Sequence, residues 1–133
     1  MDKAHSYTSG RKILIVEDDS SESEIMDIKF NQEGFEVIRA KDGEEGFHIA
    51  TKEQPNLIML DLKLPKMDGI TVMRKLKEDE WGKNIPIIIL TNVPPEDRIV
   101  EKVAEDEPAY FLPKAEMSLD DVVAKAKEVL NIV

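Results

Sequence analysis

The chain has 133 residues, 41% of them apolar, and a formal net charge of −10. Its length suits one globular domain with a single core, and its negative charge, without a dense Lys/Arg run, argues against direct binding to DNA. The lack of cysteine excludes disulfides and cysteine chemistry, and no apolar run approaches the roughly 20 residues of a membrane span, so we predict a cytoplasmic protein without membrane insertion.

After a polar segment that predicts a disordered N-terminal tail over residues 1–10, short apolar runs alternate with longer segments of helical period. This alternation is typical of the α/β class, in which helices cover both faces of a parallel sheet. The predicted strands are residues 12–16, 36–40, 57–60, 85–90 and 110–112. The predicted helices are residues 21–33, 43–53, 69–79, 96–105 and 118–130. We therefore predict one domain over residues 11–133.

Single residues predict where some of these elements lie in the sheet and where some helices begin. Residues 36–40 are more polar than the other strands, which predicts an edge strand. Ser118 with Asp121 predicts a capped start for the last helix, and Asp19 is a candidate cap for the first. Asp68 and Gly69 precede a helical stripe, so we expect them to shape a loop and a helix cap.

Polar residues follow four of the predicted strands. In an open parallel sheet, ligands bind outside the carboxyl ends of the strands, so residues distant in the chain are expected to converge there. The residues at these positions are Glu17, Asp18 and Asp19 after the first strand, Asp61 after the third, Thr91 and Asn92 after the fourth, and Lys114 after the fifth.

Several carboxylates in one cleft repel each other unless a proton or a cation neutralises them. Their oxygen ligands favour a hard cation, and Mg²⁺ is the expected cofactor. A carboxylate such as Asp61 can also attack phosphorus and form an aspartyl phosphate when cations offset the charge of the phosphoryl oxygens. Lys114 would supply one such cation, and Thr91 a hydroxyl donor.

Four segments carry a specific resemblance: ILIVEDDS, LIMLDLKLPKMDG, PIIILTNV and YFLPKA. In this order they resemble the landmarks of response-regulator receiver domains, of the chemotaxis-regulator type, from two-component signal transduction. The resemblance covers the chain from Arg11 to its end. It implies a five-stranded, doubly wound, flavodoxin-like (βα)5 fold with strand order 2-1-3-4-5.

The resemblance also implies roles for individual residues. Asp61 would accept the phosphoryl group, Thr91 would close onto it and Lys114 would pair with it. The implied metal site is formed by Asp18, Asp61 and the backbone carbonyl of Lys63, with Glu17 acting through water. Thr91 and Phe111 are the implied switch residues.

Phe111 and Ala115, both beside the site, depart from the family pattern. Phe111 stands where many members have tyrosine, so a switch hydrogen bond through a ring hydroxyl is excluded, although ring burial can still distinguish two states. Strand alternation directs Tyr110 to the opposite face. Ala115 replaces the usual proline after the lysine, and we therefore expect a trans peptide bond after Lys114.

We expect a phosphoacceptor that receives its phosphoryl group from a histidine kinase or phosphotransfer protein and switches conformation to control a downstream protein, with a phosphorylation-dependent homodimer as one outcome. The chain would stand alone or be excised from a larger protein. It would not be an enzyme beyond catalysing its own phosphorylation and dephosphorylation. The alternatives are a degenerate receiver that only binds proteins and a Mg²⁺-dependent phosphatase with an aspartate nucleophile. Lys63 argues against the phosphatase, because such enzymes carry a second Asp two residues after the nucleophile.

Overall fold

The computed structural model describes residues 10–94, 97–105 and 108–132. Within these ranges, five parallel strands form one sheet in the predicted order β2-β1-β3-β4-β5. The strands are β1 (Lys12–Val16), β2 (Glu36–Ala40), β3 (Leu57–Leu60), β4 (Ile87–Thr91) and β5 (Tyr110–Pro113). The helices are α2 (Ser20–Gln32), α3 (Gly43–Glu53), α4 (Gly69–Glu78), α5 (Arg98–Glu105) and α6 (Leu119–Val129), with short 3-10 helices η1 (Gly82–Asn84) and η2 (Lys114–Glu116).

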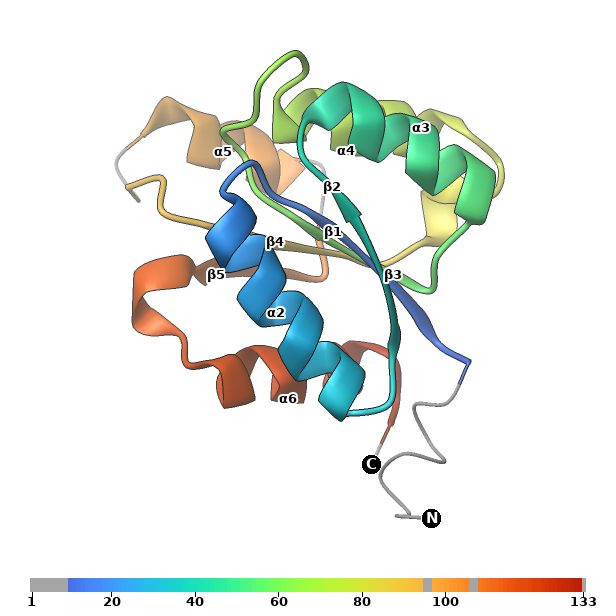
Figure 1. Ribbon diagram of the computed structural model, residues 1–133. Coiled ribbons are helices and arrows are strands. Elements are labelled where there is room, and N and C mark those ends of the chain that lie inside the picture. The colour runs from blue at the N-terminus through green and yellow to red at the C-terminus, as the bar shows by residue number, and fades with distance from the viewer. Residues whose placement is uncertain (1–9, 95–96, 106–107, 133) are drawn as a thin grey trace.

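Helices cover both faces of the sheet, as the alternating pattern predicts (Figure 1). Helices α2 and α6 lie on one face, and α3, α4 and α5 lie on the other. Along β1, Ile13 and Ile15 join the core under α2 and α6, whereas Leu14 and Val16 join the opposite core. Because both faces are covered, the central strands are apolar throughout.

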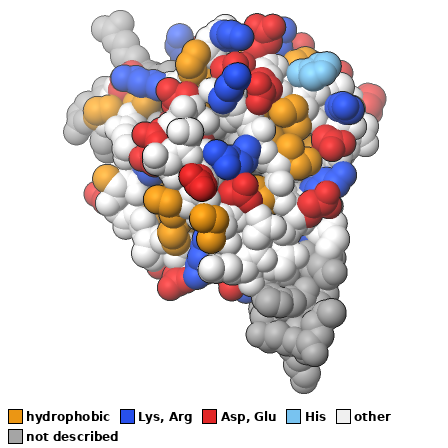
Figure 2. Space-filling model, in the orientation of Figure 1, with side chains coloured by type: hydrophobic (Ala, Val, Ile, Leu, Met, Phe, Trp, Pro, Cys, Tyr) orange, Lys and Arg blue, Asp and Glu red, His pale blue; other side chains and the backbone are white. Residues whose placement is uncertain are grey.

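The charged surface residues do not separate by sign on the face seen in Figure 2, where Lys and Arg side chains are interspersed with Asp and Glu. The more polar strand β2 lies at one edge of the sheet, as predicted. The position of β2 leaves β1 and β3 in the interior of the sheet, where they carry the acidic residues of the site.

The predicted helix caps are present. The Asp19 carboxylate accepts hydrogen bonds from the backbone N–H groups of Ser21 and Glu22 at the start of α2. Asp68 accepts from the N–H of Thr71 at the start of α4, and Ser118 forms a reciprocal capping box with Asp121 at α6. These contacts satisfy N–H groups that lack partners inside the helix.

Strand β4 starts at Ile87 instead of the predicted residue 85. Pro86 has no N–H to donate to a neighbouring strand, and the N–H of Ile85 bonds the carbonyl of Gly82, which closes η1. The two 3-10 helices were not predicted, because three residues carry no periodic signal.

Some predictions lie outside the described residues. The tail prediction falls on residues 1–9, which the structure does not describe, and the predicted helix start at Glu96 is also outside. The described helix α5 begins at Arg98. Within the described residues, no helix combines the length and apolarity needed to cross a membrane.

Candidate functional site

Two backbone hydrogen bonds bring the acidic residues together at the carboxyl edge of the sheet. The N–H of Asp61 donates to the carbonyl of Val16 at 3.2 Å, which aligns the end of β3 with the end of β1. The N–H of Glu17 donates to the carbonyl of Ala40 at 3.0 Å, which continues the β1–β2 ladder. Parallel pairing therefore places Glu17 and Asp61 on neighbouring strand ends, as predicted.

Glu17, Asp18 and Asp61 form a carboxylate cluster. One oxygen from each lies within 4.8 Å of the others. An octahedral Mg²⁺ with bonds of 2.0–2.1 Å needs ligand oxygens no more than about 4 Å apart, so small side-chain adjustments would suffice. The donor set, all oxygen and strongly negative, fits this hard cation. The acidic cluster is typical of a Mg²⁺ site.

The Glu17 carboxylate is the most buried of the three, with only 4% of the residue exposed. Burial raises the pKa of this carboxyl to about 7, although hydrogen bonds from the Lys114 ammonium and the Asp19 N–H favour its charged form. The nearby charge of Asp61 acts in the same direction as burial. Loss of water on burial is therefore the main reason that the folded chain disfavours the ionised form of Glu17.

Lys114 lies at the opposite side of the site, directly after β5. Among the described residues, its ammonium donates to Asp61 Oδ2 at 3.0 Å, to Glu22 Oε2 at 2.9 Å and to Glu17 Oε1. Burial alone would lower the pKa of this ammonium, but the three carboxylate partners outweigh burial and hold the pKa above its usual value. Lys114 is therefore a fixed cation at the edge of the acidic cluster.

Thr91 ends β4 and is 1% exposed. Its hydroxyl donates to Asp61 Oδ1 at 2.7 Å and accepts from the backbone N–H of Val93 at 3.3 Å. Asp61 is therefore held from two directions, by a hydroxyl on one oxygen and by an ammonium on the other. This convergence of Asp61, Thr91 and Lys114 was predicted from their positions after three different strands.

The start of α4 also packs against the site. A Cβ atom at Gly69 would lie 2.2 Å from the carbonyl oxygen of Asp61, a distance that no side chain could occupy. The N–H of Gly69 instead donates to the carbonyl of Leu62 at 2.8 Å. The sequence Asp68-Gly69 thus combines a helix cap with the close approach that shapes the loop after Asp61.

A family model for the response regulator receiver domain matches residues 13–127. The chain belongs to this family.

A curated relative of this receiver is the DNA-binding dual master transcriptional regulator RpaA of Synechocystis. It is 45% identical over 80 residues, which are 60% of this chain and 33% of that protein. The chain spans 33% or less of the length of several curated relatives that it matches.

Two solved structures share the receiver fold over most of their length. The receiver domain of a signal transduction histidine kinase from Syntrophus aciditrophicus has a TM-score of 0.84 and 27% identity, covering 92% of this chain and 91% of that one. CheY in the CheX-CheY-BeF3-Mg²⁺ complex of Borrelia burgdorferi matches with a TM-score of 0.81 and 26% identity, covering 92% of this chain and 90% of that one. The Borrelia complex contains Mg²⁺ and a second protein.

Membership of this family makes the chain a signalling domain rather than an enzyme that turns over a metabolite. Receiver domains of this family interact with histidine kinases and with target proteins. In this receiver, Phe111 is partly buried and packs on the core under α3, α4 and α5, whereas Tyr110 packs on the other core, as strand alternation predicts. No peptide bond in the described residues is cis, which confirms the trans bond expected after Lys114.

Two further predicted residues lie in loops at the edge of the site. Asn92 and Lys63 are exposed in the loops after β4 and β3, and the Lys63 carbonyl stays a predicted metal ligand. Sequence reasoning missed Glu22 as a partner of Lys114. A signal for it was present, because a helix capped by Asp19 puts Glu22 in its first turn, close to the strand ends.

Proposed function

We propose that this receiver is a phosphoacceptor in a two-component phosphorelay and that Asp61 takes its phosphoryl group from the phosphohistidine of a histidine kinase or a phosphotransfer protein. The observation that supports this role is the arrangement of the Asp61 carboxylate, which contacts the Thr91 hydroxyl and the Lys114 ammonium beside Glu17 and Asp18. A carboxylate in these surroundings has both a nucleophilic oxygen and neighbours suited to phosphoryl oxygens.

In the transfer, an Asp61 oxygen forms a bond to phosphorus as the bond between phosphorus and the donor's imidazole nitrogen breaks. The imidazole keeps the electron pair of the broken bond and takes a proton, and Asp61 becomes an acyl phosphate. Beside the cluster, Glu17 and Asp18 line a hollow of about 350 Å³ together with Arg39 and Lys41.

The residues around Asp61 would stabilise the added charge. The Lys114 ammonium would pair with one phosphoryl oxygen, and the Thr91 hydroxyl would turn from Asp61 to donate to another. Mg²⁺, when bound, supplies positive charge that offsets the carboxylates and the phosphoryl oxygens. Asp18, Asp61 and the Lys63 carbonyl would hold the metal, with Glu17 reaching it through water.

Phosphorylation would shift an equilibrium between two conformations. Thr91 would move toward the phosphoryl group, and Phe111, which packs against the core beside β4, would change its ring position in response. The surface formed by α5, β5 and α6 would carry this change to a downstream protein or to a second phosphorylated copy of the chain. We expect no direct DNA binding, and a cytoplasmic location stays a prediction.

The test is the intact mass of the protein after incubation with Mg²⁺ and a small phosphoryl donor such as acetyl phosphate. Wild type should gain one phosphoryl group, and it should gain none without Mg²⁺. The variant Asp61→Asn should gain none in either condition. Labelling of Asp61→Asn to the wild-type extent would exclude Asp61 as the acceptor.

The same experiment separates the alternatives. A degenerate receiver would remain unmodified with the small donor and also with a phosphorylated histidine kinase. A phosphatase with an aspartate nucleophile would release phosphate from many phosphomonoesters, and Lys63 occupies the position where such an enzyme needs a second acid. A degenerate receiver would not need the ammonium and the hydroxyl that both contact Asp61.

A further inference from the structure

Every N–H donor of the Lys114 ammonium has a carboxylate acceptor in the described structure. An ammonium has three donors, and they are directed to Glu17, Glu22 and Asp61. On phosphorylation the Asp61 carboxylate loses its charge, which makes one of these three donors available to the phosphoryl group. Lys114 can donate a second hydrogen bond to the phosphoryl oxygens only if Glu17 or Glu22 is released.

Of these two partners, Glu22 costs less to release. Its side chain is 41% exposed, against 3% for Glu17, so water can replace the lost hydrogen bond. Glu22 also lies in the first turn of α2, where the helix dipole favours a free negative charge. Glu17, by contrast, is buried and is also held by the N–H of Asp19 at 3.1 Å.

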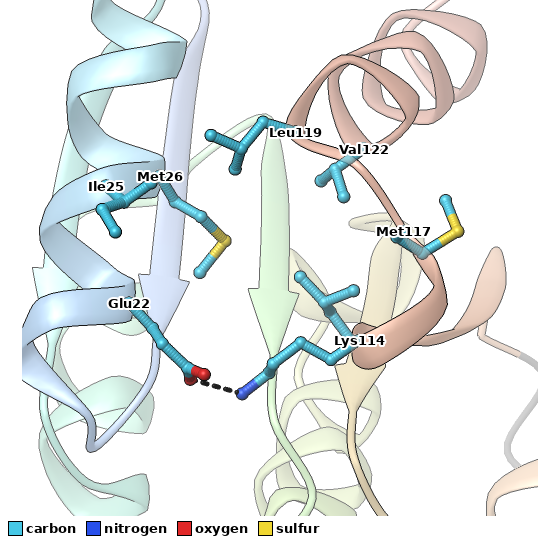
Figure 3. A pocket seen from close by; sticks show the side chains of 8 residues that line it. Glu22, Ile25, Met26, Lys114, Met117, Leu119 and Val122 are labelled. Carbon is cyan, nitrogen blue, oxygen red and sulfur yellow. Dashed lines mark hydrogen bonds and ion pairs between the residues drawn. The ribbon is translucent and has the colours of Figure 1, made fainter.

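The contact between Glu22 and Lys114 joins two parts of the fold. Figure 3 shows Glu22 reaching from α2 toward Lys114, which comes from the end of β5. A mainly apolar cavity of about 120 Å³, lined by Met26, Leu90 and Met117 among others, adjoins the pair. Apolar walls offer Lys114 no alternative acceptor on that side, so its position depends on the carboxylates.

We propose that Glu22 competes with the phosphoryl group for Lys114: it holds the ammonium in the unphosphorylated chain and is the partner that Lys114 releases when Asp61 is phosphorylated. This inference rests on the proposed phosphoacceptor function. Glu22 is thus a positioning residue that acts through Lys114. Its charge makes the phosphorylated form less favourable than it would be with a neutral residue at this position.

The test uses beryllofluoride, a phosphoryl analogue that binds without forming the acyl phosphate, at saturating Mg²⁺. Glu22→Gln should bind it about 2- to 5-fold more tightly than wild type, the effect expected for losing one partly exposed ion pair. Glu24→Gln is the matched control, because Glu24 is an exposed carboxylate on the same helix and is not among the partners of Lys114. This control should bind beryllofluoride as wild type does.

A second readout follows Lys114 itself. The ¹⁵Nζ resonance of Lys114, recorded without Mg²⁺ or beryllofluoride, should move in Glu22→Gln and remain in place in Glu24→Gln. The role of Glu22 would be overturned if wild type and Glu22→Gln bound beryllofluoride with equal affinity. It would also be overturned if Glu22→Gln and Glu24→Gln gained affinity equally. Either result would leave the proposed phosphoacceptor function untouched. Failure of the wild type to bind beryllofluoride with Mg²⁺ would overturn the proposed function and this inference with it.

Discussion

The two sides of the site differ in how their charges are balanced. On one side, β1 and β3 bring three carboxylates within 4.8 Å of one another, and the most buried of them, Glu17, has its pKa raised to about 7. On the other side, the single ammonium of Lys114 contacts three carboxylates, and its pKa is held above the usual value. The two sides share Glu17 and Asp61, yet burial disfavours the ionised form of Glu17, whereas the Lys114 ammonium has an acceptor for every donor.

This difference indicates which groups stabilise the fold and which are kept for function. Lys114 gains favourable contacts when the chain folds, whereas ionised Glu17 loses water without full compensation. Burial of the ionised Glu17 carboxylate therefore lowers stability, and a cation beside it would offset this cost.

Removing the cation should produce the largest effect. Lys114→Met leaves partly buried carboxylates without their ammonium, so the free energy of unfolding without Mg²⁺ should fall by about 3 kcal/mol. Urea unfolding measures this change. Lys127→Met is the control, because Lys127 pairs with the more exposed Glu33 and should cost less than about 1 kcal/mol. Equal losses in the two variants would contradict the special place of Lys114.

Neutralising Glu17 should raise the free energy of unfolding at high pH, whereas removing Lys114 lowers it. The pKa of Glu17 rises from the ordinary value of 4.5 to about 7 in the folded chain, so the contribution of Glu17 to stability is present below pH 4.5 and is lost as the pH rises to about 7. Glu17→Gln does not titrate and should exceed wild type by up to about 3 kcal/mol well above pH 7 without Mg²⁺. Unfolding free energies measured across this pH range test the claim, and parallel pH profiles of the two proteins would refute it.

Mg²⁺ should stabilise the folded chain through the carboxylate cluster. At a Mg²⁺ concentration one hundred times the dissociation constant, the expected gain is about 2.7 kcal/mol. Asp18→Asn should lose most of this gain at the same concentration, because it removes a carboxylate of the cluster. Asp19→Asn, next in the chain but a helix cap, should keep it. Thermal unfolding with and without Mg²⁺ distinguishes the two variants.

The hydrogen bond from Thr91 to Asp61 should contribute the smallest effect. Thr91→Val should lower the free energy of unfolding by about 1–2 kcal/mol, because it removes a buried hydroxyl with two partners. In an Asp61→Ala background the same change should cost about 1 kcal/mol less, since the main partner is already absent. The same cost in both backgrounds would mean that the hydroxyl does not act through Asp61.

Much of the fold was predictable because its signals are local. Strands β1, β2 and β3 and helix α3 have the predicted bounds, since each apolar run or helical stripe ends at polar residues, glycine or proline. The prediction for β4 was two residues too early, because apolar Ile85 and Pro86 resemble a buried strand although proline cannot donate to the ladder. Helix η2, which begins at Lys114, follows from tertiary packing and has no periodic pattern.

The candidate site was predictable where one rule sufficed. Residues that follow parallel strands meet at one edge of the sheet, and this rule found Asp61, Thr91 and Lys114. Glu22 belongs to a helix, and its contact with Lys114 depends on how α2 and β5 lie in three dimensions across 92 residues of sequence. The raised pKa of Glu17 also depends on burial, which the sequence does not quantify.

Chemical trapping of the acceptor shows whether Asp61 itself carries the phosphoryl group. After phosphorylation with Mg²⁺ and a small donor, borohydride reduces an aspartyl phosphate to homoserine, and peptide mass mapping then locates the altered residue. We expect homoserine at Asp61 alone, and none when Mg²⁺ is omitted. Trapping at Asp18 or Glu17 with Asp61 unchanged would show that Asp61 is not the acceptor.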